Sequence, residues 1–294
     1  MVRYLTNRIV FNKLETIYRT IHHQPVTTRQ FKEEFSERDM IGKIQEDVQH
    51  WAEEKTLEIS QLKQMEKYRR EFLGNVSHEL KTPIFNIQGY ILTLLEGGID
   101  DSNINKLYLQ RAEKSINRMI SIVEDLESIS RLESGTFKLD FTRFDLVRLV
   151  EEVFENLEMY ARKKNISLHI KRSSLGSALW VKADKKRIFE VISNLVINSI
   201  NYGKESGKTI VSFKDGADHI TVFVTDNGIG IPQKDMPRIF ERFYRVDQSR
   251  SRNLGGTGLG LAIVKHVIEA HNGTLRVNSR WHEGSEFSFT LEKG

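Results

Sequence analysis

The sequence contains no cysteine among its 294 residues. This absence excludes disulfide bridges, thiolate metal sites and cysteine nucleophiles. The sequence also lacks an apolar run long enough to cross a bilayer, and it shows no signal peptide. An excess of charge of one sign is missing as well. The net charge is only +4 and is spread along the chain, which argues against nucleic-acid binding.

Neither proline nor glycine occurs between Gly42 and Gly74, and this gap predicts one continuous helix. A short amphipathic helix is expected before it, ending ahead of Pro25, and a polar connector follows over residues 24–38. Asp39 supplies an acidic cap for the second helix. Basic residues of the kind that follow a membrane helix on its cytoplasmic side are Arg3, Arg8, Lys13 and Arg19. They predict a tether at the cytoplasmic face of the membrane, through a segment outside this sequence.

Two stripes of apolar residues at helical spacing predict a helical hairpin that turns near Gly97 and Gly98 and ends at Gly135. The first stripe consists of Leu73, Val76, Leu80, Ile84, Ile87, Ile91 and Leu94. The second consists of Leu109, Ala112, Ile116, Met119, Val123 and Leu126. Two helices in a hairpin cannot cover their apolar faces alone. We therefore expect two copies to pair as a four-helix bundle, which makes the protein a homodimer.

His78 is expected on the outer side of the first hairpin helix, with the Glu79 carboxylate beside it and the Thr82 hydroxyl one turn further on. Pro83 removes a backbone donor and crowds the carbonyl of Glu79, so the helix should bend just past the histidine. An exposed imidazole next to a potential base can attack a phosphoryl group. A lone histidine of this kind is more often a plain surface residue, and the choice depends on a nucleotide site further along the chain.

The pattern changes after Gly135 to short alternating segments between capped helices. Strands are expected at residues 137–141, 166–170, 209–213, 220–225, 274–278 and 287–291. Asp145 and Asp184 are expected to cap helices that reach Lys164 and Tyr202. Helices mixed with mainly antiparallel strands predict an α/β sandwich with the helices on one face of one sheet. The fold class is therefore α+β with several domains.

Two asparagines, Asn194 and Asn198, fall one turn apart on one helical face. An amide oxygen is a neutral, hard ligand suited to a Mg²⁺ that keeps its charge for phosphates. Asp226 follows a predicted strand and precedes Gly228 and Gly230. Its carboxylate can accept a hydrogen bond from an adenine amino group, and the glycines let the backbone approach the base. Read alone, the same residues are a polar helix face and a turn.

A second glycine-rich stretch, residues 255–262, leads into a helix that runs through His271. Backbone donors at such a helix N-terminus form a phosphate cradle. The missing lysine excludes a P-loop of the GxxxxGK[ST] type. The cradle contains Gly256, Thr257, Gly258, Leu259 and Gly260.

The stretch His78-Glu79-Leu80-Lys81-Thr82-Pro83 resembles the phosphoacceptor box of sensor histidine kinases of two-component systems. Four further motifs follow in the family's order. They are similar to the N box at residues 194–202, the first glycine box from Asp226, the F box at residues 239–245 and the second glycine box at residues 255–262. The resemblance implies that Arg242 and Arg245 of the F box reach phosphate oxygens and that residues 245–254 form a mobile lid over the nucleotide. This resemblance covers the chain from about residue 65 to its end. The first 65 residues resemble the HAMP signal-relay module over a shorter match, with a plain coiled-coil spacer as the alternative.

The resemblance implies three parts: a HAMP-like or coiled-coil signal helix at residues 1–65, a dimerisation and phosphotransfer hairpin at 66–135, and a catalytic domain at 136–294. The catalytic domain would have the ATP-binding fold shared with gyrase and Hsp90. The implied cofactors are ATP and Mg²⁺, with Asn198 as the metal ligand. The residues implied in nucleotide binding are Asn194, Asn198, Tyr202, Asp226, Gly228, Gly230, Arg242, Arg245, Gly256, Thr257, Gly258, Leu259 and Gly260.

The resemblance also implies a sequence of reactions. ATP phosphorylates His78 with Glu79 as general base, and the phosphoryl group then passes to an aspartate of a response regulator. The regulator's receiver domain would dock near residues 82–95. Thr82 would orient a water that removes phosphate from the regulator, which makes the protein bifunctional.

One position departs from the family pattern, because Asn201 stands where the family commonly has a lysine that contacts phosphate. Mg²⁺, the arginines and the helix terminus would then supply more of the charge compensation. Two other functions compete with the kinase. A related ATPase would carry a water-activating glutamate where this chain has Asn194. Such an ATPase would also have no use for the hairpin that carries His78. The intact set of His78, Glu79, Asn198 and Asp226 argues against the other alternative, a non-catalytic ATP-binding scaffold.

Overall fold

The computed structural model describes residues 13, 16, 40–133, 139–171, 178–246 and 256–294. The chain divides into two compact units, Met1–Gly74 and Asn75–Gly294. None of the described helices combines the length and the apolar character that a bilayer span requires. The expected first helix and the polar connector after it lie almost wholly outside the described residues.

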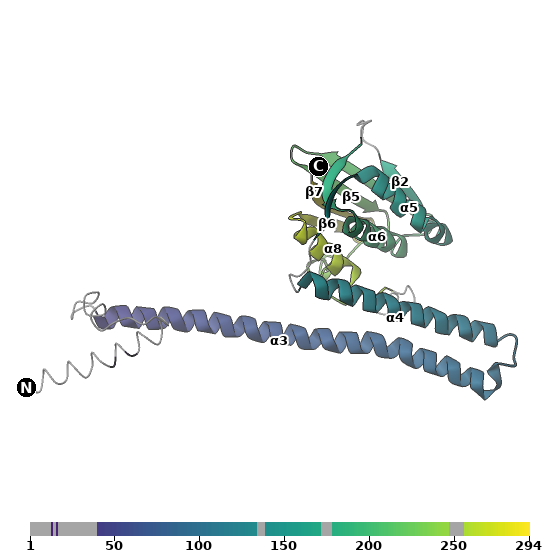
Figure 1. Ribbon diagram of the computed structural model, residues 1–294, viewed down its shortest axis with the longest axis horizontal. Coiled ribbons are helices and arrows are strands. Elements are labelled where there is room, and N and C mark those ends of the chain that lie inside the picture. The colour runs from purple at the N-terminus through teal and green to yellow at the C-terminus, as the bar shows by residue number, and fades with distance from the viewer. Residues whose placement is uncertain (1–12, 14–15, 17–39, 134–138, 172–177, 247–255) are drawn as a thin grey trace, which may run out of the picture. The chain divides into compact units, whose positions relative to one another are not determined.

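A long helix, α3 (Met40–Thr93), a tight turn, η1 (Leu94–Gly98), and a second helix, α4 (Asn105–Glu133), form the predicted hairpin. Figure 1 shows α4 beside the second half of α3. The turn requires Gly97, whose φ of +110° is a backbone conformation that residues with a side chain disfavour. The helical backbone of α3 continues through Pro83. The bend that we expect beyond His78 stays a prediction.

The C-terminal domain is built on a five-stranded sheet in the order β2-β4-β5-β7-β6. Its strands are β2 (Ser167–Lys171), β4 (Lys208–Asp215), β5 (His219–Asp226), β6 (Leu275–Arg280) and β7 (Gly284–Glu292). β2 pairs with β4 in parallel, whereas the pairs β4-β5, β5-β7 and β6-β7 are antiparallel. A separate two-stranded sheet joins β1 (Phe141–Asp145) to β3 (Trp180–Asp184).

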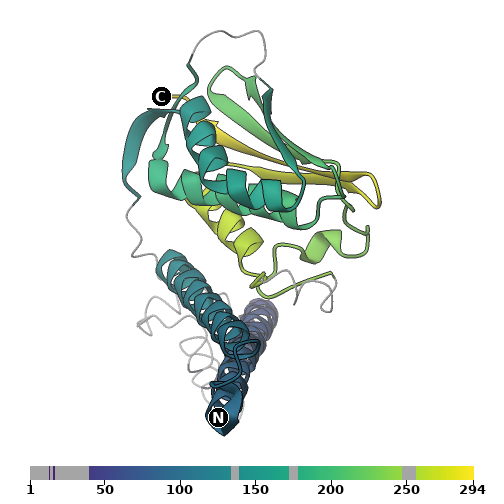
Figure 2. The ribbon, with the colours of Figure 1, turned by 90° about the vertical axis from the view of Figure 1, so that its right-hand side faces the viewer.

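Three helices, α5 (Leu146–Lys163), α6 (Lys185–Asn201) and α8 (Gly260–Ala270), lie on one face of the five-stranded sheet (Figures 1 and 2). The predicted caps are confirmed, because the Asp145 carboxylate accepts from the Val147 amide and the Asp184 carboxylate accepts from the Arg187 amide. Alternate residues of β5 face these helices and are buried, namely Ile220, Val222 and Val224. The α/β sandwich is therefore confirmed.

The strand predicted at residues 137–141 is only partly correct over its described part, because the observed strand starts later. Leu139 and Asp140 are not in a strand, and β1 begins at Phe141. The alternation of Leu139 and Phe141 suggested an earlier start, but pairing with β3, about 40 residues away, determines where the strand begins. In this pairing Phe141 lies opposite Asp184. β3 itself is a strand that the sequence pattern did not predict. Its short run around Val181 has too few alternating residues to stand out.

Candidate functional site

His78 projects from the exposed side of α3, as the sequence predicts, with 67% of its side chain exposed. Its Nδ1 atom lies 3.9 Å from Oε1 of Glu79, which is longer than a hydrogen bond but within the range of a rotamer adjustment. The Thr82 hydroxyl donates to the main-chain oxygen of His78 at 3.2 Å, so it lies on the same side of the helix one turn further on. The three residues thus lie close together within two turns of α3.

Glu79 turns inward where His78 turns outward. Its carboxylate accepts a 2.7 Å hydrogen bond from Arg118 of α4, and each of these two side chains is only 19% exposed. The contact joins the two helices of the hairpin 39 residues apart in sequence. Charge-assisted hydrogen bonds of this length are strong when solvent is largely excluded. The carboxylate next to the histidine is therefore held in place by a cation from the opposite helix.

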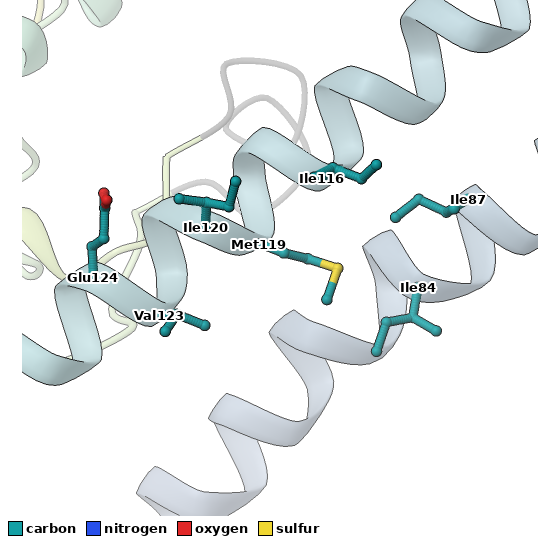
Figure 3. A pocket seen from close by; sticks show the side chains of 7 residues that line it. All are labelled: Ile84, Ile87, Ile116, Met119, Ile120, Val123 and Glu124. Atoms are coloured by element: carbon teal, nitrogen blue, oxygen red, sulfur yellow. The ribbon is translucent and has the colours of Figure 1, made fainter.

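Apolar side chains of both hairpin helices, together with Glu124 of α4, line a groove of about 490 Å³. In Figure 3, Met119 of α4 points toward Ile84 and Ile87 of α3, and Ile116, Ile120 and Val123 continue the groove along α4. The helices do not cover these residues, since Ile120 and Val123 are half exposed. Such a concentration of exposed apolar residues on one side of a hairpin marks an interaction surface.

The polar face of α6 carries Asn194 and Asn198, both half-buried. Asn194 packs against the first residue of α8, because its Oδ1 would lie 3.0 Å from a Cβ added at Gly260. Asn201, at the end of the same helix, accepts a 2.5 Å hydrogen bond from the Tyr160 hydroxyl of α5. Burial raises the pKa of Tyr160, against the opposite effect of this hydrogen bond. The residue that replaces the family's lysine is thus engaged by a tyrosine.

Asp226 ends β5 and is held by the turn that follows it. Its Oδ1 atom accepts from the Gly228 amide at 2.8 Å and from the Ser285 amide of β7 at 3.3 Å. Burial raises the pKa of Asp226, and the two amides and Lys204 act in the opposite direction. Both of these amide donors reach the same oxygen, so the carboxylate has a fixed direction. A carboxylate held in this way can present its other oxygen to a ligand.

The glycines at this turn have no room for a side chain. A Cβ at Gly228 would lie 2.4 Å from the main-chain oxygen of Tyr202, and one at Gly230 would lie 2.0 Å from that of Arg280. Gly230 also has a φ of +68°. The Ile229 amide donates to the same Tyr202 oxygen at 3.0 Å. The turn after Asp226 is therefore packed directly onto the C-terminal end of α6, the helix that carries Asn194 and Asn198.

The second glycine-rich stretch enters α8 as predicted. Gly258 has a φ of +77°, and its main-chain oxygen accepts from the Phe243 amide at 2.9 Å, which ties the stretch to the predicted F box. Leu259 is fully buried. A Cβ at Gly256 would meet nothing within 4 Å, so the backbone at this glycine borders open space. This arrangement suits backbone donors that are to face a phosphate group.

Thr257 of that stretch contacts the hairpin. Its hydroxyl donates to the Asp125 carboxylate of α4 at 2.7 Å and accepts from the Leu259 amide at 3.2 Å. Burial raises the pKa of Asp125 to about 6, the Thr257 hydroxyl acts in the opposite direction, and the charges of Glu190 and Glu124 raise it further. A residue predicted to bind phosphate is thus engaged by a carboxylate.

Arg242 approaches α8, where its guanidinium lies 3.4 Å from Nε2 of His266. Burial lowers the pKa of His266, and the positive charge of Arg242 lowers it further. Arg245 is half-buried at the end of the described F-box residues. Most of the predicted lid lies outside the described residues. Among the described residues no group of three or more His, Cys, Asp or Glu side chains could hold a metal ion. The role of Asn198 as a Mg²⁺ ligand stays a prediction.

Sequence reasoning missed three residues that contact predicted site residues or Asn201: Arg118, Asp125 and Tyr160. Arg118 and Asp125 are polar residues next to the apolar stripe of α4, and the helical pattern of that stripe assigns them no role. Their partners, Glu79 and Thr257, are 39 and 132 residues away, and a spacing of that kind carries no periodic signal. For Tyr160, the sequence offered one indirect signal: Asn201 replaces the lysine common in the family, and an asparagine there can accept a hydrogen bond from another side chain.

Comparison with protein families finds two matches. Residues 68–135 match the His Kinase A (phospho-acceptor) domain, and residues 183–294 match the histidine kinase-, DNA gyrase B- and HSP90-like ATPase. The sensor histidine kinase WalK of Bacillus subtilis is 34% identical over 236 residues, which are 80% of this chain and 38% of that kinase. The sensor protein kinase WalK of Staphylococcus aureus is 33% identical over 80% of this chain and 56% of its own length. The matched part of this chain thus corresponds to about two fifths of the length of the first relative and a little over half of the length of the second.

Solved structures give a consistent picture. Histidine kinase ThkA in complex with response regulator protein TrrA matches 81% of this chain and 67% of that chain, with 28% identity and a TM-score of 0.62. Acinetobacter baumannii histidine kinase AdeS matches 74% of this chain and 98% of that chain, with 27% identity and a TM-score of 0.58. Both similarities extend over the hairpin and the α/β sandwich together, since either domain alone covers a smaller share of the chain.

Proposed function

Since this chain belongs to the sensor histidine kinases of two-component systems, we propose that it is an ATP-dependent protein-histidine kinase. It phosphorylates itself on His78 and passes the phosphoryl group to an aspartate of a response regulator. The single observation that carries this proposal is a divided site within one chain. An exposed imidazole next to a carboxylate lies on the hairpin, and a glycine-lined site around Asp226 lies in the C-terminal domain.

In the first reaction, Nε2 of His78 attacks the γ-phosphorus of ATP. The bond from that phosphorus to the bridging oxygen breaks as the phosphorus–nitrogen bond forms, and ADP leaves. The proton on Nδ1 passes to Glu79, whose Oε1 is the carboxylate oxygen facing that nitrogen. In the second reaction, the receiver aspartate attacks the phosphohistidine and His78 regains a proton. The exposure of His78 suits both reactions, because two different domains must reach it.

The nucleotide is proposed to bind with its adenine on Asp226 and its phosphates toward the start of α8. The half-buried Asn198 amide fits Mg²⁺, which takes few protein ligands when phosphates and water complete its shell. When bound, that ion neutralises phosphate charge during transfer. With Asn201 accepting from Tyr160, the Arg242 and Arg245 guanidinium groups supply the remaining positive charge.

Two partners are proposed. A second copy of the chain covers the apolar groove of the hairpin and completes a four-helix bundle. A response regulator receiver domain docks along residues 82–95, where Thr82 orients the water that hydrolyses its aspartyl phosphate. The solved ThkA–TrrA complex supports this choice of partner, since this chain is similar to that kinase over both domains. The division into residues 1–65, 66–135 and 136–294, and a location at the cytoplasmic face of the membrane, stay predictions.

The competing functions differ from the kinase in where the γ-phosphate goes. Incubation with γ-labelled ATP and Mg²⁺, followed by addition of purified receiver domains, separates them. The kinase takes up acid-labile label and loses it to a receiver domain. A scaffold takes up none and releases no phosphate, whereas an ATPase releases phosphate without labelling itself. Either of the last two results would overturn the proposed function.

A further inference from the structure

Arg118 lies directly behind the predicted general base. It comes from α4, and its guanidinium donates to Oε2 of Glu79 at 2.7 Å. Each side chain of this pair is 19% exposed, so the contact is made largely out of water, where an ionic hydrogen bond is less screened than on the surface. The reaction described above assigns no role to this arginine.

The two oxygens of Glu79 have different neighbours. Oε2 faces Arg118, whereas Oε1 faces Nδ1 of His78 at 3.9 Å. The arginine contacts the carboxylate through its NH2 group, and its buried Nε has no acceptor among the residues that the structure describes. The contact is therefore made at one point rather than as a two-point fork, which would occupy both oxygens. Oε1 is left for the histidine.

We propose that Arg118 is a positioning residue for autophosphorylation, which holds the Glu79 carboxylate so that Oε1 takes the Nδ1 proton of His78. This inference rests on the proposed function. A glutamate on an open helix face samples many rotamers, and holding it in one orientation beforehand removes that entropy from the barrier. The guanidinium stays charged throughout and cannot accept the proton itself. The proton therefore moves from Nδ1 to Glu79 and then to water, while the arginine keeps its place.

A purely structural role for Arg118 is the main competing explanation, because the same ion pair links α3 to α4. The two roles differ in what they do to the kinetics. A structural link affects the fold, and through it both ATP use and phosphoryl transfer. A positioning residue acts through Glu79 alone, so its loss lowers kcat without changing the KM for ATP. When Glu79 has already been replaced, losing the arginine as well causes no further decrease in kcat.

The experiment measures kcat and KM for ATP in autophosphorylation of the full chain. The variants are Arg118→Ala, Arg118→Lys, Glu79→Gln and the double variant Arg118→Ala/Glu79→Gln. Arg111→Ala is the matched control, since Arg111 lies two turns earlier on α4 and contacts the Tyr108 ring rather than a carboxylate. We expect Arg118→Ala to lower kcat about tenfold with an unchanged KM, a part of what a general base contributes. Arg118→Lys should restore most of the loss, and the double variant should match Glu79→Gln.

Several results would contradict the role of Arg118. A double variant slower than Glu79→Gln, or a lysine variant no better than alanine, would make the arginine a structural link. A faster Arg118→Ala variant would mean that the arginine holds the base away from the histidine. These results all require a wild type that labels itself. A wild type that takes no label would instead overturn the proposed function, so the two failures are distinguishable.

Discussion

On the hairpin, the side chain that we expect to carry the phosphoryl group is 67% exposed, and the apolar residues of the groove are also partly exposed. In the C-terminal domain, Asp226 is tied to two main-chain amides, and core side chains of the sheet and its helices, such as Val222 and Ile192, are completely buried. The nucleotide side therefore completes its own core within one chain, whereas the histidine side depends on surfaces that other molecules must cover. Substitutions on the hairpin should consequently affect dimerisation and the access of other domains to His78, whereas substitutions in the C-terminal domain should affect nucleotide binding.

The largest effect should come from a charge in the apolar groove. Ile120→Asp replaces an isoleucine of the groove by a carboxylate. The Ile120 side chain is 50% exposed in one chain, and we expect the second chain of the dimer to cover it. Burying two unpaired charges in one dimer should raise its dissociation constant about 1,000-fold or more. Sedimentation at several protein concentrations measures this. Met159→Asp is the control, because Met159 is exposed on α5 outside the groove. A dimer that tolerates Ile120→Asp would show that this surface is not the interface.

The second effect should be confined to the nucleotide side. Asp226→Asn keeps the oxygen that accepts from the Gly228 amide, so the turn should survive. It also places an amide donor where an adenine amino group needs an acceptor, which should weaken ATP binding about 100-fold. Asn198→Asp alters the predicted Mg²⁺ ligand and should impair binding or turnover as well. Calorimetric titration with ATP tests both variants, and wild-type affinity in both would mean that the pocket lies elsewhere.

A third effect should appear at the regulator and leave ATP use intact. Thr82→Ala removes a hydroxyl that donates to the His78 main-chain oxygen on an exposed helix face. The change should spare autophosphorylation and transfer, and it should not destabilise the helix. It should lengthen the lifetime of the phosphorylated regulator about tenfold through loss of an oriented water. Equal lifetimes with both proteins, alongside clear acceleration by the wild type, would leave Thr82 without this role.

The smallest effect should lie where the two sides meet. Burial raises the pKa of Asp125 to about 6, so packing α4 against the cradle favours the protonated carboxyl, although the Thr257 hydroxyl by itself favours the ionised form. The contribution is greatest at low pH and is lost as the pH rises through 6, with Glu190 and Glu124 adding to the loss. Lowering the pH from 7 to 5 should therefore strengthen the contact between α4 and the cradle about threefold.

Asp125→Asn removes the charge and should abolish this pH dependence. A donor and acceptor dye pair on α4 and α8 reports the contact, and the two attachment cysteines can be introduced cleanly because the chain has none. Wild-type pH dependence in the Asp125→Asn variant would assign the titration to another group.

Much of this architecture could be predicted from the sequence. The caps at Asp145 and Asp184, the turn at Gly97 and the helices of the sandwich follow from local chemistry, and all are found. β1 was predicted too early and β3 was missed, because their pairing joins segments about 40 residues apart. The same limit applies to the site. His78, Glu79 and Thr82 share one helix and could be grouped, but the contacts of Glu79 with Arg118 and of Thr257 with Asp125 depend on tertiary packing.

The most direct test of this account is the location of the label after incubation with γ-labelled ATP. Wild type, His78→Gln and His50→Gln should be compared. His50 is the matched control, because it also lies exposed on α3 with a glutamate, Glu54, 3.6 Å away. We expect acid-labile label on the wild type and on His50→Gln, and none on His78→Gln, with ATP binding equal in all three. Undiminished label on His78→Gln would contradict the assignment of the phosphoacceptor and the account built on it.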